Sequence, residues 1–126
     1  MGWCIPDEQT PALLDLLEKA RSAELHVPPV WASEFSNVLG KAHQRGRLTD
    51  ADVSSALELV ANLNIRIAQG WDNITLAEAL VMMHRYSLTS YDASYLARAI
   101  ERKLPLATLD KDLRDAAIMA GVRLLI

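Results

Sequence analysis

The sequence predicts an α/β fold, a three-layer α/β/α arrangement in which helices enclose a parallel sheet. Apolar residues recur at the 3.6-residue period of helices in several segments. Short apolar runs of strand length lie between these segments, so helices and strands alternate along the chain. Parallel strands require long crossover connections, which are right-handed, and helices of this length supply them.

The first half of the chain predicts helices and two short strands in alternation. Pro11 suits the first turn of a helix, and Thr49 is a good N-cap before an acidic first turn. Pro28 and Pro29 separate the first strand from the helix that follows it. The predicted helices cover 10–23, 30–46 and 49–61, and the predicted strands cover 25–28 and 65–67.

The second half predicts the same alternation. Met82 and Met83 are expected to pack in the core, and Gly121 is expected to end the last helix. The predicted helices cover 71–86, 90–103 and 113–120, and the predicted strands cover 104–109 and 122–126.

Composition limits the class of protein. The 126 residues, 51% of them hydrophobic, predict a single domain over residues 1–126. The net charge of −3 gives no overall attraction to nucleic acid, and solvated helix faces explain the local cluster of Lys41, Arg45 and Arg47 equally well. Cys4 excludes an internal disulfide and is expected to be a small buried side chain. With no apolar run of membrane-spanning length and no signal-peptide pattern, we expect a soluble, cytoplasmic protein without membrane contact.

Two acids fall on apolar helix faces. Glu34 lies in the stripe that includes Trp31 and Val38, and Asp92 lies in register with Leu96 and Ile100. A buried carboxylate loses hydration, at a cost of several kcal/mol as an order of magnitude, unless a cation or hydrogen-bond donors replace the water. A divalent metal is the simplest compensation. The structural alternative for Glu34 is a buried acid paired with an Arg or a helix end. For Asp92 it is an acid in the first turn, after a plausible N-cap at Thr89 and Ser90, that complements the helix dipole.

A third acid, Asp110, follows the predicted strand 104–109 and opens the next helix. Ligands bind at the carboxyl ends of strands in open parallel sheets, so Asp110 is a candidate ligand. An ordinary N-cap is an equally good explanation. Thr108 and Asp112 are weaker candidates beside it.

Three motifs in this order resemble the PIN domain, especially VapC-type toxin ribonucleases. They are WASEFSNVL at 31–39, TSYDASYLA at 89–97 and ATLDKDL at 107–113, and the resemblance extends over nearly the whole chain. The resemblance implies a metal-dependent endoribonuclease, usually a homodimer and usually silenced by a cognate antitoxin protein. It implies that Glu34, Asp92 and Asp110 are catalytic metal ligands, with Asn37 and Thr108 as supporting polar groups.

The chemistry of these residues agrees with that function. Hydrolysis of an RNA phosphodiester needs a nucleophilic water and charge neutralisation at phosphorus, and a carboxylate-bound divalent cation provides both. Hard oxygen ligands favour Mg²⁺ or Mn²⁺ over zinc.

The chain departs from the family at its beginning. Family members start with a central strand that carries the first metal-binding Asp, whereas this sequence starts in the turn after it, and Asp7 and Glu8 match the following loop. We therefore expect the N-terminal central strand to be missing from the chain as written. An internal methionine taken as the start, a lost gene beginning and a deliberately shortened chain are the competing explanations. The last two would leave an unpaired sheet interior and low stability.

Two other functions compete with the ribonuclease. The first is a noncatalytic PIN remnant that binds an antitoxin or a second copy of itself through apolar surfaces. The second, a phosphoacceptor or phosphatase of similar fold, is disfavoured because such sites usually need paired acids at the first strand.

Overall fold

The computed structural model describes residues 10–69 and 73–125. The chain divides into two compact units, residues 1–67 and 68–126, and each is described by itself. Our predictions for Cys4, Asp7, Glu8, the helix start at Trp71 and the strand end at Ile126 lie outside the described residues.

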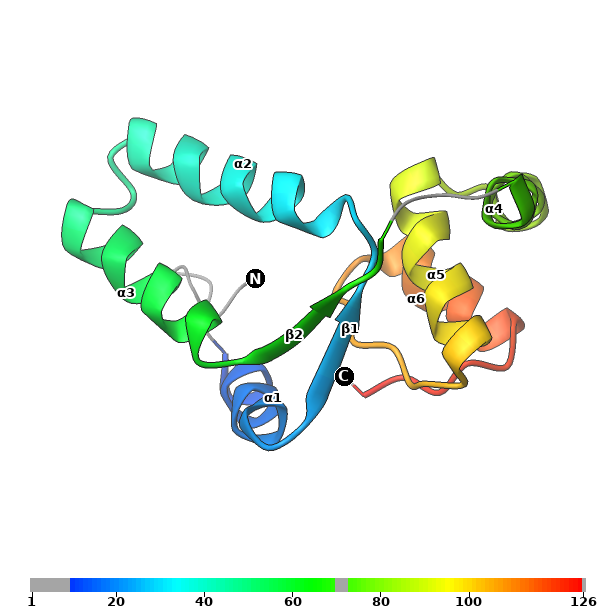
Figure 1. Ribbon diagram of the computed structural model, residues 1–126, viewed down its shortest axis with the longest axis horizontal. Coiled ribbons are helices and arrows are strands. Elements are labelled where there is room, and N and C mark those ends of the chain that lie inside the picture. The colour runs from blue at the N-terminus through cyan, green and yellow to red at the C-terminus, as the bar shows by residue number, and fades with distance from the viewer. Residues whose placement is uncertain (1–9, 70–72, 126) are drawn as a thin grey trace. The chain divides into compact units, whose positions relative to one another are not determined.

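The first unit contains three helices and two strands among its described residues (Figure 1). Local signals set the helix starts. The hydroxyl of Thr10 accepts a hydrogen bond from the Leu13 amide at 3.2 Å, with Pro11 in the first turn. The elements are α1 (Pro11–Arg21), β1 (Glu24–Val27), α2 (Trp31–Gln44), α3 (Asp50–Ala61) and β2 (Asn64–Ile67).

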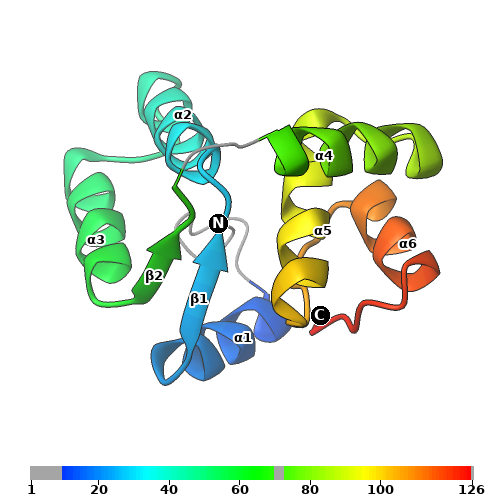
Figure 2. The same cartoon turned by 45° about the vertical axis from the view of Figure 1, so that its right-hand side comes forward.

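β1 and β2 pair in parallel, with Glu24 opposite Asn64 and Val27 opposite Ile67. Figure 2 shows the two strands side by side. The connection between them consists of α2 and α3, the long crossover that a parallel pair requires. The predicted α/β class and parallel pairing are confirmed.

Two apolar clusters stabilise this unit. One joins α2 to α3 and contains Phe35, Leu39, Ala42, Leu48 and Ala56. The other packs α1 against the chain just before β2 and contains Leu17, Ala20 and Leu63. The first cluster therefore packs the two crossover helices against each other, and the second packs α1 beside the strands.

The second unit is built around α5 (Ser90–Arg102), which contacts both α4 (Asn73–Tyr86) and α6 (Lys111–Met119). Leu96 on α5 is completely buried in a cluster with residues such as Leu106 and Leu113. Met82 and Met83 pack against this cluster, which confirms their predicted core role. The last helix ends as predicted, because Gly121 adopts a φ of 77° and the Val122 amide donates to the Ala117 carbonyl at 2.8 Å.

The strands predicted over 104–109 and 122–126 are wrong. The described residues there form only an isolated parallel bridge between Leu106 and Leu124. Its hydrogen bonds run from the Leu106 amide to Arg123 at 2.8 Å and from the Leu125 amide to Leu106 at 3.0 Å. Pro105 has no backbone N–H to donate to a neighbouring strand. An apolar run also becomes a strand only where a partner strand continues beside it.

The buried helix faces are narrower than their apolar stripes. Val38 and Ile100, which we expected in the core, are 36% and 38% exposed. Each lies at the edge of its helix's buried face, beside the buried residues Leu39 and Ala99. Helical periodicity identifies a stripe correctly but does not fix its width.

Truncation of the central helix is expected to destabilise the second unit strongly. Leu96→Ala leaves a cavity in a closed cluster, so we expect a loss of about 2–5 kcal/mol in the free energy of unfolding, measured by urea denaturation. Ile118→Ala, at a 65% exposed position on α6, is the control and should cost much less. Equal losses in the two variants would contradict the described core.

Stability is also expected to depend on pH through the first turn of α3. The Thr49 amide donates to the Asp52 carboxylate at 2.8 Å, and the Thr49 hydroxyl accepts from the Asp52 amide at 3.1 Å. The hydrogen bond from the Thr49 backbone, with a smaller contribution from its side chain, lowers the pKa of Asp52 below 3.8. A carboxyl with a lowered folded-state pKa stabilises the fold above its unfolded value and loses this contribution as the pH falls through the folded value.

We therefore expect Asp52→Asn to lower the unfolding midpoint relative to the parent at pH 6, and the two midpoints to converge as the pH is lowered toward 2. Glu58→Gln, at an exposed position on the same helix, provides the control. A constant difference between Asp52→Asn and the parent at all pH values would show that this carboxylate hydrogen bond does not titrate as described.

Candidate active site

The three candidate acids all lie where a helix begins. Glu34 is in the first turn of α2, directly after β1 and the Pro28–Pro29 turn. The Glu34 amide donates to the Val30 carbonyl at 3.0 Å, and the rings of Trp31 and Phe35 stack with their centroids 5.1 Å apart. Phe35 is buried and Glu34 is half-buried, so the carboxylate borders the core and is not enclosed by it.

Asp92 is the third residue of α5. The Thr89 hydroxyl caps this helix by accepting a hydrogen bond from the Asp92 amide at 3.2 Å. The next residue, Ala93, is completely buried, whereas Asp92 is half-buried. The predicted cap and first-turn position are confirmed, and they fix the backbone from which the carboxylate extends.

Asp110 is the N-cap of α6. Its Oδ1 accepts a hydrogen bond from the Leu113 amide at 2.9 Å, and its own amide donates to the Thr108 hydroxyl at 3.2 Å. The residue is exposed, and the N-cap that the sequence offered as an equally good explanation is confirmed. Because an ionised carboxylate has two acceptor oxygens, capping by Oδ1 leaves acceptor capacity for a cation.

The supporting candidates have simpler surroundings. Thr108 is half-buried, and its carbonyl accepts a hydrogen bond from the Arg114 guanidinium at 3.2 Å. Asp112 is an exposed acid in the first turn of α6. The nearby Asp115 hydrogen-bonds Lys111 at 2.8 Å and raises the pKa of that lysine, with a smaller contribution from Asp112.

Carboxylate oxygens are suitable ligands for a hard divalent cation, but the structure does not show these three acids assembled into a metal site. Glu34 belongs to the first unit, and Asp92 and Asp110 belong to the second. Within residues 10–69 and 73–125, no group of three or more His, Cys, Asp or Glu side chains is placed to hold a metal ion. Each acid lies at a helix N-terminus, where the partial positive charge of the helix makes an acidic side chain favourable. The ligand set of Glu34, Asp92 and Asp110 stays a prediction.

Sequence reasoning missed a polar groove on α2. The groove has a volume of about 410 Å³. It is lined by Ser33, Ser36, Asn37, Gly40, Lys41 and Gln44. Among them is Asn37, which we had predicted as a supporting residue. The signal in the sequence is a row of small or polar residues at helical spacing, which resembles an ordinary solvated face.

The chain matches the family model of the PIN domain over residues 4–119, and it belongs to this family. The match extends across both units. PIN domains are generally nucleases and typically use divalent metal ions, so membership indicates a nuclease-type function. A search of curated proteins finds no match.

In the part of the chain that the structure describes, no helix has the length and apolar character needed to cross a membrane.

The two roles of Asp110 can be separated by substitution. Asp110→Ala removes the cap and is expected to cost about 1 kcal/mol in the free energy of unfolding. Asp110→Asn keeps a side-chain oxygen for the Leu113 amide and should remain close to the parent in stability, while it loses the negative charge. Urea denaturation without metal measures both. A loss in Asp110→Asn as large as that in Asp110→Ala would contradict the cap geometry.

Proposed function

We propose that this PIN-domain protein is an Mg²⁺- or Mn²⁺-dependent endoribonuclease of the VapC type, the toxin of a type II toxin–antitoxin pair. The observation that carries the proposal is the position of its acids within a PIN domain. Glu34 and Asp92 are half-buried in first turns, and Asp110 caps the next helix. These carboxylates are held by backbone structure and not by long flexible loops.

The three acids would hold the cation. When bound, it would supply a Lewis acid at the scissile phosphate and a water of lowered pKa. The contribution of the protein is to orient the ligands. The Thr89 cap fixes the turn that carries Asp92, and the Leu113 amide restrains Oδ1 of Asp110. Asn37, Thr108 and Asp112 are proposed as supporting polar groups around the acids.

The proposal includes RNA as substrate, a cognate antitoxin and a homodimer, in the cytoplasm. Exposed apolar side chains support a protein partner. In the second unit they occur on α4 and α6, and include Leu80 at 64% and Met119 at 73% exposure. The same observation favours the second candidate function, a noncatalytic module that binds an antitoxin or another copy of the chain.

RNA cleavage distinguishes these functions. We expect Mn²⁺ or Mg²⁺ to support cleavage of total RNA by the purified chain, and EDTA to stop it. Glu34→Gln and Asp92→Asn should each reduce the rate by about a hundredfold or more, because replacement of groups that merely orient metal ligands already costs 10- to 100-fold. Gel electrophoresis of the RNA products measures the rate.

Asp15→Asn, at an exposed acid on α1, is the matched control and should cleave at the parental rate. Far-UV circular dichroism would establish that each variant is folded. No cleavage by the folded parent with either metal would favour the binding module. Cleavage that survives both Glu34→Gln and Asp92→Asn would contradict the proposed site.

A further inference from the structure

Tyr91 carries an aromatic ring that the core does not use. Among the aromatic residues that the structure describes, it alone is exposed, at 57%. The others belong to the core clusters or pack against them: Trp31, Phe35, Tyr86 and Tyr95. An exposed ring gives up much of the free energy that its burial would contribute. Packing within the described residues therefore does not explain an aromatic side chain at this position.

The backbone that carries this ring is held in place. Tyr91 directly precedes Asp92 in the first turn of α5. Its carbonyl accepts a hydrogen bond from the Ser94 hydroxyl at 2.6 Å, and Ser94 is only 6% exposed. The next amide, that of Asp92, donates to the Thr89 hydroxyl at 3.2 Å. The ring therefore extends from a fixed turn beside a candidate acid, so little conformational freedom is lost when a flat ligand stacks on it.

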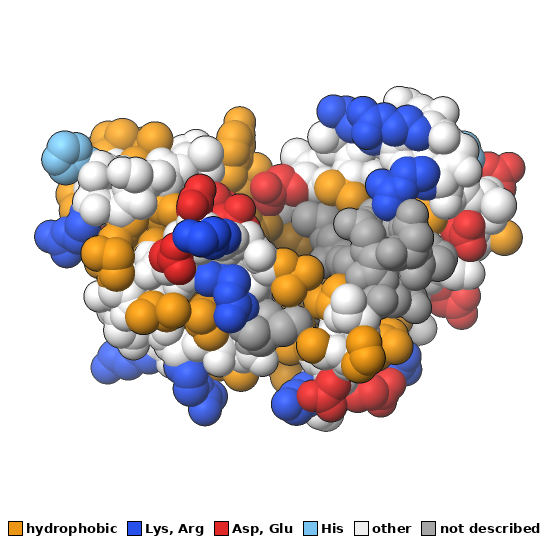
Figure 3. All heavy atoms as spheres, turned by 180° about the vertical axis from the view of Figure 1, so that it is seen from behind, with side chains coloured by type: hydrophobic (Ala, Val, Ile, Leu, Met, Phe, Trp, Pro, Cys, Tyr) orange, Lys and Arg blue, Asp and Glu red, His pale blue; other side chains and the backbone are white. Residues whose placement is uncertain are grey.

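Leu109 has the same position relative to Asp110 and is 61% exposed. Its turn is also held, because the Asp110 amide donates to the Thr108 hydroxyl and the Arg114 guanidinium donates to the Thr108 carbonyl, both at 3.2 Å. A single exposed leucine is ordinary on a protein surface. In the second unit, however, an exposed apolar side chain directly precedes each candidate acid. Figure 3 shows, at the left of the view, hydrophobic side chains beside acidic ones on one face of this unit.

The starts of α5 and α6 lie on the same side of the second unit (Figures 1 and 2). Their first turns share one core. Ala93, the residue after Asp92, and Leu113, whose amide donates to the Asp110 carboxylate, belong to the same buried cluster. The exposed apolar side chains that precede the two acids therefore border the same edge of the unit.

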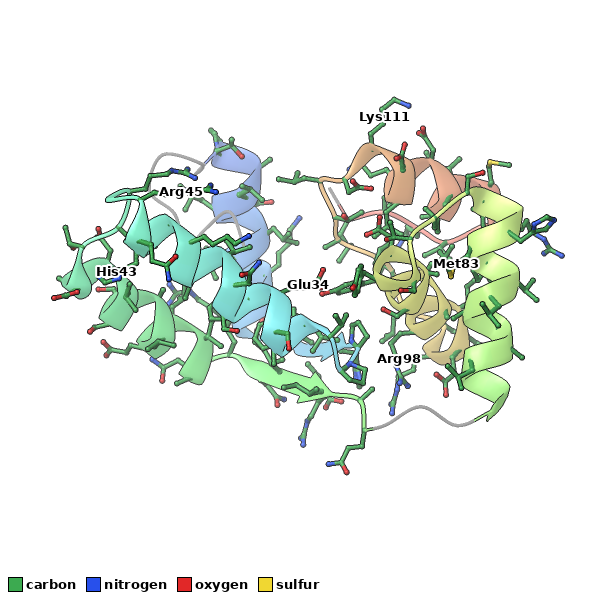
Figure 4. All side chains as sticks on the ribbon, turned by 90° about the horizontal axis from the view of Figure 1, so that it is seen from above. Glu34, His43, Arg45, Met83, Arg98 and Lys111 are labelled. Atoms are coloured by element: carbon green, nitrogen blue, oxygen red, sulfur yellow. The ribbon has the colours of Figure 1, made fainter. Side chains whose placement is uncertain are left out.

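Two cations of these helices are already engaged by acids of their own helix. On α5, Arg98 follows Tyr91 by about two turns and donates to Glu101 at 2.9 Å. On α6, Lys111 donates to Asp115 at 2.8 Å. Figure 4 shows Arg98 and Lys111 on opposite sides of the second unit. A ligand at the helix starts would therefore gain more from apolar contact than from these two charges.

We infer that Tyr91 and Leu109 form a subsite for one nucleobase, that of the nucleotide next to the phosphate that is cut. The base stacks on the Tyr91 ring, and Leu109 contacts it from the α6 side. The inference rests on the proposed function, because it places the cut phosphate at a cation held by Asp92 and Asp110. Every nucleobase offers a flat π face to an aromatic side chain. Because the base must leave its neighbours to stack in this way, the subsite selects an unpaired nucleotide over a paired one.

Binding of strands with and without bases tests the subsite. The probes are a fluorescein-labelled oligouridylate of about 12 nucleotides and a labelled ribose–phosphate strand of the same length that lacks bases. Both carry the same charge, and fluorescence polarisation is measured in EDTA so that neither is cut. Tyr91→Ala should weaken binding of the oligouridylate about 5- to 150-fold, the range for loss of one stacked base, and leave binding of the baseless strand unchanged. Tyr91→Phe keeps the ring and should bind both probes as the parent does.

Two further variants test the α6 side of the subsite. Leu109→Ala should weaken oligouridylate binding less than Tyr91→Ala does, because an aliphatic side chain contacts a base without stacking on it. Ile118→Ala is the matched control, since it truncates an apolar side chain at a 65% exposed position on the same helix, and it should leave both affinities unchanged. All three positions are exposed, so the variants should keep the parental melting temperature. Parental oligouridylate affinity in Leu109→Ala would overturn the placement of the base between α5 and α6.

Salt dependence and oligomeric state separate stacking from other roles of Tyr91. The slope of log Kd against log salt should be the same in Tyr91→Ala and the parent, because no phosphate contact is lost. Equal affinities of the parent for the two probes would overturn the inference, and so would equal losses for both probes in Tyr91→Ala. A changed oligomeric mass of Tyr91→Ala in sedimentation velocity, with parental affinity for both probes, would overturn it in favour of a protein contact.

The binding assay fails independently of the proposed function. Base-dependent binding that Tyr91→Ala removes supports the nucleobase subsite even if the chain cleaves no RNA with either metal. Metal-dependent cleavage that Glu34→Gln abolishes, together with parental oligouridylate affinity in Tyr91→Ala, supports the ribonuclease and overturns the inference.

Discussion

The candidate site depends on one constraint: the first amides of α2, α5 and α6 have no carbonyl acceptor within their own helix. These groups need acceptors, and their partial positive charge favours acids nearby. In α5 the Thr89 hydroxyl accepts a hydrogen bond from the Asp92 amide, whereas in α6 the Asp110 carboxylate is itself the cap. Helix formation thus fixes the backbone of each acid before any cation is present, and it limits how far a bound cation would have to reorganise its ligands.

The cores hold these helix starts in place. Ala93 is completely buried directly after Asp92, and Phe35 is buried directly after Glu34. The backbone of a residue beside a buried one cannot move far without disturbing the packing. The same arrangement explains why Glu34 and Asp92 are half-buried, although their spacing places them on apolar stripes. Each lies at the first turn, where the stripe meets the end of the helix and solvent.

The sequence predicted correctly those features that depend on residues near one another in the chain, such as helix caps. It failed for features that depend on a partner distant in the sequence, such as the extent of a strand. The caps at Thr49 and Thr89 are local, and both were predicted correctly. The strand at 104–109 was wrong, because its extent depends on a partner that pairs only at Leu124. The α2 groove was missed because its residues individually resemble a solvated face.

The proposed function requires that Glu34, Asp92 and Asp110 hold a divalent cation together. Titration of the ¹⁵N-labelled chain with paramagnetic Mn²⁺ tests this directly, because amide resonances near the ion broaden. The account predicts that resonances around these three residues broaden together and saturate at one equivalent, and that Asp92→Asn weakens all three effects at once. Broadening at only one of the acids, or at each with a different affinity, would contradict it.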